Sequence, residues 1–331
     1  MCKTYDFCGI FLAVFTVFLL LFGNFVCNYF CIFYWYYEPN PAKQLLYGIP
    51  LTGMGTVYAL TFNYLCVMSL SSHWRAAWAD PGIVAKQSEP PGNMDPARVK
   101  MCKKCDNSWK PERAHHCSEC GNCIFKMDHH CPWINNCVGV KNLKYFMLFI
   151  IYTGLSAAYL CLMLILSFYH LMTAKSKVHQ QKDGYMLAFV MCVIGFIEGI
   201  LFTFFCFELV QEQFESIGDN QTYVDDMKET FGRPQALVDN LFQSLGEDWT
   251  WWLIPTHPVL NINYFEKLYT IKQLKKLREF EEDEYDDSHK ERGVNMRKAW
   301  IEKKILIGLV ALSTTAWFGY MRYEVQSRFI Q

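Results

Sequence analysis

Residues 102–137 read CKKCDNSWKPERAHHCSECGNCIFKMDHHCPWINNC, and this stretch constrains the fold more than any other part of the chain. It holds seven of the chain's 15 cysteines and four of its nine histidines. Repeated Cys-x-x-Cys pairs with histidines nearby have the spacing of tetrahedral zinc sites. Two closed zinc sites need eight ligands, so the stretch offers more candidates than two zinc ions would use.

Other interpretations of this stretch fit less well. Iron–sulfur clusters prefer ligation by cysteine alone. A nucleic-acid-binding finger would normally come with a basic excess, whereas the net charge is −1 and no basic recognition helix follows. Few aliphatic residues lie between positions 100 and 126 to form a core. We therefore expect no nucleic-acid partner, and a region that folds only with zinc, whose ligation supplies roughly 10–16 kcal/mol in small zinc modules.

Four apolar segments flank the Cys-rich stretch, at 7–37, 49–70, 145–170 and 185–210. About 20 apolar residues cross a bilayer core as a helix, so each segment is long enough. Buried helices of a soluble core are the alternative, but a chain of 331 residues does not need four of them. The predicted fold class is therefore an all-α polytopic membrane protein. It has a four-helix transmembrane bundle and an irregular zinc-bound Cys-rich domain, about 99–144, between spans 2 and 3.

The positively charged residues predict the orientation of these spans. The loop 71–144 contains eleven Lys and Arg residues, whereas the loops after the first and third spans contain four together. The richer side faces the cytoplasm, so the Cys-rich loop and the tail 211–304 are expected in the cytosol. Cysteines stay reduced there, which favours metal ligation over disulfides.

Two segments of the tail leave alternatives open. Residues 305–320 are uncharged but slightly short for a span, so they are either a fifth span or an interfacial helix. Residues 281–287 form an acidic run that is either a solvated linker or a strip that docks a partner.

The motif Asp128-His129-His130-Cys131, inside the Cys/His frame and between two spans, resembles the DHHC family of protein S-acyltransferases, or palmitoyltransferases. The resemblance extends to Asp80-Pro-Gly82 after the second span and to residues 240–246, and it covers roughly residues 1–260. The chain differs from the family where Thr-Thr-x-Glu often follows the fourth span, because its nearest stretch is Thr222-Tyr-Val-Asp225. The spacing from Cys105 to His116 is also one residue longer than expected.

The resemblance implies a role for each member of the motif. One zinc ion would be held by Cys102, Cys105, His116 and Cys123, and a second by Cys117, Cys120, His130 and Cys137. Cys131 would be the nucleophile, with His129 as its general base and Asp128 orienting the imidazole. The alternative roles are a further metal ligand for Cys131 and a structural cap for Asp128.

The implied reaction has two steps and uses a long-chain acyl-CoA as donor. Cys131 takes the acyl group, palmitoyl in the type reaction, and a cysteine of a protein at the cytosolic membrane face then takes it from Cys131. Trp133, Phe146 and Phe149 are candidates for contact with the acyl chain or thioester, although packing or lipid contact would also explain them. Arg113, Lys126, Lys141 and Lys144 are candidates for the CoA phosphates, and Asp80 and Asn240 are expected to be structural.

The expected location is an internal membrane, Golgi or endoplasmic reticulum, with the active site in the cytosol. A second class of function is a catalytically inactive, membrane-tethered zinc adaptor that binds partners. A thiol beyond the eight zinc ligands distinguishes the two, because an adaptor does not need one.

Overall fold

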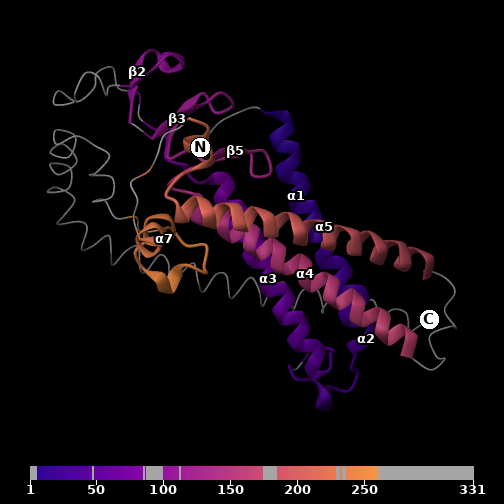
Figure 1. Cartoon of the computed structure of the whole chain (residues 1–331). Coiled ribbons are helices and arrows are strands. Elements are labelled where there is room, and N and C mark those ends of the chain that lie inside the picture. Colours follow the sequence, from indigo (N-terminus) through magenta and orange to yellow (C-terminus); the bar gives the residue numbers. More distant parts are fainter. Residues whose placement is uncertain are drawn as a thin grey trace. The chain divides into compact units, whose positions relative to one another are not determined.

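The structure is a computed structural model, and it describes residues 6–46, 48–84, 86, 100–111, 113–173, 185–228, 232, 236–258 and 260. Helices dominate it, which confirms the predicted class (Figure 1). In chain order the elements are α1 (Phe7–Val26), a π-helix (Cys27–Phe33), α2 (Tyr34–Tyr36), a 3₁₀-helix (Pro41–Lys43), α3 (Gly53–Trp78), β1 (Lys100–Cys102), a 3₁₀-helix (Lys103–Cys105), β2 (Ser108–Lys110), β3 (Ala114–Cys117), β4 (Asn122–Phe125), β5 (His129–Cys131), β6 (Asn136–Val138), α4 (Leu143–Thr173), α5 (Tyr185–Gly218), α6 (Tyr223–Met227), α7 (Leu237–Leu245) and a 3₁₀-helix (Trp249–Trp251).

Four helical stretches are long and apolar enough to cross a membrane, as the sequence predicts: Phe7–Tyr36, Gly53–Trp78, Leu143–Thr173 and Met186–Gly218. The second and fourth continue past the ends of the predicted spans, at residues 70 and 210. Their extensions contain Gln, Glu and Arg, which favour helix without being apolar. A search by hydropathy therefore finds only the apolar part of each helix.

The chain forms two compact units. One is built from the described residues of Phe15–Leu70 and Ile150–Leu209, and the other from those of Met1–Val14, Ser71–Phe149 and Val210–Lys303. The first unit is a bundle of helices, and the second contains the Cys-rich stretch. Each of the four long helices contributes residues to both units.

Small and aromatic residues pack the helices of the bundle. A side chain at Gly195 would crowd Val26 of α1, and one at Gly199 would collide with Cys161 of α4. Small residues at such contacts let helix backbones approach closely, which is the usual packing of spans. The rings of Phe62 and Tyr159 stack at 5.6 Å between α3 and α4.

A buried amide cluster joins α1 to α3 in the same unit. Asn63 donates to Asn28 Oδ1 at 3.0 Å, and Asn24 donates to Asn63 Oδ1 at 3.2 Å. The Asn28 side chain also donates to the backbone carbonyl of Asn24 at 3.0 Å. That carbonyl normally accepts the backbone N–H four residues on, so the side chain competes with the helical ladder where the π-helix begins.

Three short antiparallel hairpins organise the Cys-rich stretch, β1–β2, β3–β4 and β5–β6. The expectation of an irregular domain was therefore incomplete. The strands have three or four residues and lack a clear period-2 hydrophobic pattern, because many of their positions are Cys or His. The predicted fifth helix at 305–320, the acidic run at 281–287 and the rest of the tail from 261 lie outside the described residues.

Candidate active site

The first cluster of metal-ligating side chains forms around β3 and β4. His116 and Cys123 lie directly opposite each other in this hairpin, and Cys102 and Cys105 flank the 3₁₀ turn after β1. The Nδ1 atom of His116 lies 3.5 Å from Cys102 Sγ, 3.2 Å from Cys105 Sγ and 3.9 Å from Cys123 Sγ. The structure thus brings together the four residues expected in the first zinc site. The Cys105–His116 spacing, one residue longer than expected, does not prevent this.

The second cluster joins the β3–β4 and β5–β6 hairpins. His130 lies opposite Cys137 in the β5–β6 register, and Cys117 and Cys120 come from the end of β3 and the turn that follows. The Nδ1 atom of His130 lies 3.7 Å from Cys117 Sγ, 3.5 Å from Cys120 Sγ and 3.7 Å from Cys137 Sγ. These are the four residues expected in the second site.

The geometry of both clusters fits zinc. Zinc–ligand lengths in a tetrahedral Cys₃His site imply edges of about 3.6 Å from sulfur to nitrogen and about 3.8 Å between sulfurs. The observed sulfur–sulfur separations are 3.9 Å for Cys105–Cys123 and 3.3 Å for Cys120–Cys137. Four protein ligands close each site, so bound zinc would be structural.

Strand alternation separates the adjacent histidines of the motif. Successive side chains of a strand point to opposite faces, so His130 of β5 faces the second cluster while His129 and Cys131 share the other face. The same alternation in β3 sends His116 to the first cluster and Cys117 to the second. Cys131 belongs to neither cluster and is 4% exposed.

The side chains of Asp128 and His129 form a hydrogen-bonded pair. His129 Nδ1 lies 2.8 Å from Asp128 Oδ2, and the Asp128 side chain is 4% exposed. Burial alone would lower the pKa of the His129 imidazole, but its hydrogen bond to Asp128 and its interaction with Cys131 raise that pKa to about 10. Burial would raise the pKa of Asp128, yet the hydrogen bond from His129 holds it below its usual value.

Two phenylalanines at the start of α4 support this site. Phe146 places its ring edge-on to the His129 ring with 5.2 Å between centroids. Phe149 contacts His73 of α3 in the same way at 5.1 Å. His73 Nε2 in turn lies 2.9 Å from the backbone carbonyl oxygen of Trp133. Both phenylalanines are buried, so in this structure they pack against histidines.

The residues after α5 hold Asp128 from the opposite side. The backbone N–H of Tyr223 donates to Asp128 Oδ1 at 2.9 Å, and the Thr222 hydroxyl donates to the carbonyl oxygen of Met127 at 2.9 Å. Thr222 also caps α6 in a reciprocal capping box with Asp225. The stretch that departs from the family's Thr-Thr-x-Glu pattern therefore reaches the site.

A buried ionic cluster anchors that stretch to the Cys-rich region. Arg113 donates through Nε to Asp225 Oδ2 at 3.0 Å, and His115 Nε2 lies 2.8 Å from Asp225 Oδ1. Arg113 also donates to Asn220 Oδ1 at 3.0 Å. The Asp225 side chain is 0% exposed. Sequence reasoning missed His115, Asn220 and Asp225, because no spacing rule connects positions about 110 residues apart.

The four cations expected at the CoA phosphates lie in different environments. Arg113 is buried and engaged with Asp225, and Lys144 is buried with Nζ 3.3 Å from the Thr256 hydroxyl. Burial lowers the pKa of Lys126 to about 7, and its Nζ donates to Asn220. Arg113 and Lys144 thus lie inside the fold, and Lys126 is half-buried. Lys141 is the exposed member, paired with Asp80 at 2.8 Å.

The two residues expected to be structural each bond to a backbone group of another segment or turn. Asp80 Oδ1 accepts the backbone N–H groups of Gly82 and Ile83, each at 2.9 Å, and Gly82 has a positive φ of 106°. The segment then pairs with β4 through Ile83 and Ile124. Asn240 of α7 donates to the carbonyl oxygen of Gly218 at 3.0 Å, which ties α7 to the end of α5.

Comparison with known proteins identifies the family. A model of the DHHC palmitoyltransferase family matches residues 96–230. Palmitoyltransferase ZDHHC3-A of Danio rerio is 35% identical over 232 residues, which cover 67% of this chain and 67% of that protein. The chain belongs to the DHHC palmitoyltransferase family. Palmitoyltransferase ZDHHC7 of Mus musculus is 34% identical over 230 residues, covering 67% of this chain and 69% of that protein.

A plant relative extends the comparison. Probable protein S-acyltransferase 14 of Arabidopsis thaliana is 40% identical over 147 residues, covering 36% of this chain and 48% of that protein. As a DHHC palmitoyltransferase with four apolar helices, the chain is a membrane-bound protein S-acyltransferase. The family that the motif predicted is thereby confirmed.

Proposed function

We propose that this DHHC palmitoyltransferase transfers a long-chain acyl group from acyl-CoA to protein cysteines through a thioester on Cys131. The single observation that carries the proposal is the position of Cys131. It lies outside both Cys₃His clusters, on the strand face that it shares with His129. The zinc clusters thus leave one thiol free beside an imidazole, which is the requirement for an activated cysteine nucleophile.

In the first step the proton of the Cys131 thiol is held at His129 Nε2, since Nδ1 is bonded to Asp128 and the raised pKa of the imidazole favours its protonated form. The resulting thiolate attacks the carbonyl carbon of the acyl-CoA thioester, and the new sulfur–carbon bond forms as the bond to the CoA sulfur breaks. The proton on His129 passes to the departing CoA sulfur. Asp128 stabilises the imidazolium that exists between these two transfers.

In the second step a cysteine of the protein substrate repeats the exchange. Its thiol proton moves to His129, its sulfur attacks the acyl carbon on Cys131, and Cys131 leaves as thiol after recovering the proton. His129 can serve as the base in both steps, because each step exchanges one thioester for another. The enzyme therefore ends each cycle in its starting protonation state.

Zinc at the two clusters would fix the hairpins that carry this chemistry. His130 and Cys137 would hold β5 against β6, and Cys131 and His129 lie on the same short strand. A strand of three residues has too little hydrogen bonding to set these side chains by itself. Metal binding supplies rigidity, and the side chains of Cys131, His129 and Asp128 supply the reaction.

Substrate contacts form the finer part of the proposal. Phe146, which packs on His129, and Trp133, two residues after Cys131, are proposed to shield the thioester, with Phe149 behind them. Lys141 is proposed to meet a CoA phosphate, because it is the exposed member of the four candidate cations. We infer from the distribution of Lys and Arg that the site faces the cytosol. A Golgi or endoplasmic reticulum membrane is the proposed location.

Acyl labelling of the purified protein tests this proposal. Wild-type enzyme incubated with labelled palmitoyl-CoA should acquire a hydroxylamine-sensitive acyl group, and Cys131→Ser should not. Cys8→Ser, which alters an exposed cysteine away from the clusters, is the matched control and should label like wild type. Undiminished labelling of Cys131→Ser would reject the covalent mechanism, and a wild type that never labels would favour the zinc adaptor.

A further inference from the structure

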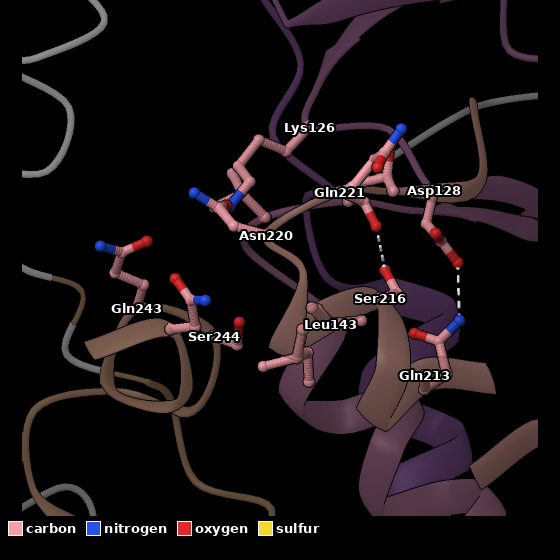
Figure 2. Close-up of a pocket in the computed structure, with 14 residues that line it drawn as sticks. Lys126, Asp128, Leu143, Gln213, Ser216, Asn220, Gln221, Gln243 and Ser244 are labelled. Atoms are coloured by element: carbon pink, nitrogen blue, oxygen red, sulfur yellow. Dashed lines mark hydrogen bonds between the residues drawn. The ribbon is translucent and has the colours of Figure 1, made fainter. Parts of the chain in front are cut away.

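Gln213 of α5 reaches Asp128 from a segment 85 residues away in the chain. Its Nε2 group donates to Asp128 Oδ2 at 2.8 Å, and Figure 2 shows this contact. The residue is 6% exposed. It lies in the polar extension of α5, beyond the apolar segment that predicts the fourth span. Gln213 is not a member of either Cys₃His cluster, and the proposed reaction assigns it no role.

The hydrogen bonds to Asp128 are arranged so that Gln213 constrains the catalytic pair. Oδ2 accepts from both His129 Nδ1 and Gln213 Nε2, each at 2.8 Å. Oδ1 accepts from the backbone N–H of Tyr223 at 2.9 Å. With both oxygens bonded, the carboxylate cannot rotate about its Cβ–Cγ bond without breaking a contact. Oδ2 is thereby held toward the imidazole.

The chemistry of an amide suits this position. A carboxylate accepts hydrogen bonds and does not donate them, so the NH₂ end of Gln213 must face Asp128. An amide donates without bringing a positive charge, so the charge of Asp128 remains available to the imidazolium of His129. A lysine or arginine in the same place would form an ion pair with Asp128 and compete with His129.

The other end of the Gln213 amide faces a small cavity (Figure 2). The cavity measures about 30 Å³ and is also lined by Asn220, Asn240 and Ser244. In the described part of the chain, Gln213 Oε1 is buried without a hydrogen-bond partner, and so is Asn240 Oδ1. A volume of this size accommodates a water molecule, whose hydrogens such oxygens accept. Gln213 and Asn240 of α7 therefore line the same cavity.

We propose that Gln213 is a positioning residue of the Asp128–His129 pair, holding Asp128 Oδ2 at the His129 imidazole during acyl transfer. The proposal rests on the proposed function of Cys131 and His129 and adds a residue to it. Gln213 acts through Asp128 and touches neither substrate nor nucleophile. Its removal should slow formation of the acyl-enzyme without weakening the binding of acyl-CoA.

The test is a double-mutant cycle between Gln213→Met and Asp128→Asn. Methionine has a similar size but no N–H donor. Rates of acyl-enzyme formation are measured with palmitoyl-CoA in single turnovers over a range of concentrations. Gln213→Met should lower the maximal rate about 10- to 100-fold, as loss of an orienting partner usually does, and change the half-saturating concentration less than about twofold. Gln211→Met, an exposed position on the same helix, is the control and should keep the wild-type rate.

The cycle separates positioning from a general structural role. If Gln213 acts through Asp128, the substitution should have little further effect in the Asp128→Asn background. An equal loss in both backgrounds would overturn the proposal, as would a wild-type rate for Gln213→Met. Should Gln213→Met lose zinc or fail to fold, Gln213→Leu also removes the donor and favours the helix. A folded Gln213→Leu with the wild-type rate would also overturn it.

These outcomes are distinct from failure of the proposed function. If Cys131→Ser still forms the acyl-enzyme, the function itself is wrong. If Cys131→Ser is inactive and Gln213→Met is unaffected, the mechanism stands and only the assignment of Gln213 falls.

Discussion

His129 Nδ1 and Asp128 Oδ2 lie 2.8 Å apart although the two residues are neighbours in the chain. Neighbouring side chains within a strand point to opposite faces, but β5 begins at His129 and Asp128 precedes it. The backbone N–H of Asp128 donates to the carbonyl oxygen of Val138 at 2.9 Å, and Tyr223 and Gln213 fix its side chain. The pair thus depends on β6, which precedes α4 in the chain, and on α5 and α6, which follow it.

Asp128→Asn should slow formation of the acyl-enzyme while leaving the protein folded. The amide cannot stabilise the imidazolium of His129, so we expect a rate loss of roughly 10²–10⁴. Single-turnover labelling with palmitoyl-CoA measures it, and zinc content reports the fold. Asp106→Asn is the control because Asp106 is 89% exposed and remote from the pair. A wild-type rate for Asp128→Asn would remove Asp128 from the mechanism.

The purified protein should contain two zinc ions per chain, one for each Cys₃His cluster. Cys105→Ser should reduce this number to about one, because three protein ligands hold zinc more weakly than four. Cys131→Ser should keep both ions, and it serves as the control for loss of a thiol. Metal analysis by mass spectrometry gives the numbers. Loss of zinc from Cys131→Ser would show that Cys131 is a ligand and would contradict its role as nucleophile.

The hydrogen bond from His73 to the Trp133 carbonyl oxygen should matter for the rate. His73→Phe preserves the ring contact with Phe149 but leaves the carbonyl without this donor. The loop after Cys131 would then be less well fixed, and we expect a loss of about tenfold in acyl-enzyme formation. His73→Gln can donate from its amide and should restore much of the rate. Equal rates for wild type, His73→Phe and His73→Gln would show that this hydrogen bond does not affect acyl-enzyme formation.

Acid should remove the stabilisation that Asp225 provides. Burial raises the pKa of Asp225, but the hydrogen bond from His115 and the charge of Arg113 lower it below the usual value. A carboxyl group with a lowered folded-state pKa stabilises the fold above its unfolded pKa, about 3.9. The stabilisation is lost as the pH falls through the folded-state value.

Asp225→Asn should therefore be less stable than wild type at neutral pH, by about 3–5 kcal/mol, because Arg113 stays buried without its counter-ion. The difference should shrink in acid, below pH about 4. Denaturant unfolding in detergent over a series of pH values measures it, with the exposed Asp226→Asn as control. A difference that does not change with pH would argue against the ion pair.

Much of the site could be predicted because its residues are close in the chain and have distinctive chemistry. The ligands from Cys102 to Cys137 repeat the spacing of zinc modules, and strand pairing places His116 beside Cys123 and His130 beside Cys137. The long apolar segments likewise predict their helices directly. Family resemblance was needed to separate the roles of His129 and His130, which strand alternation then explains.

The remainder depends on contacts that local patterns do not encode. Gln213 looks like an ordinary surface residue of a helix, and only folding places it on Asp128. Asp225 lies in a motif that differs from the family pattern, yet it binds Arg113 and His115. Arg113 and Lys144 were candidates for phosphate binding because of their positive charge. The sequence does not show which charged side chains become buried, and the structure buries both of these.

The central claim is that acyl transfer passes through Cys131, and a pulse–chase measurement tests it most directly. Enzyme labelled with palmitoyl-CoA and freed of excess donor is mixed with a cysteine-containing substrate peptide, and peptide mass spectrometry follows the acyl group on each thiol. We predict that the acyl group leaves Cys131 at the rate at which it appears on the peptide. An acyl group that stays on Cys131 while the peptide is acylated only by fresh acyl-CoA would contradict the claim.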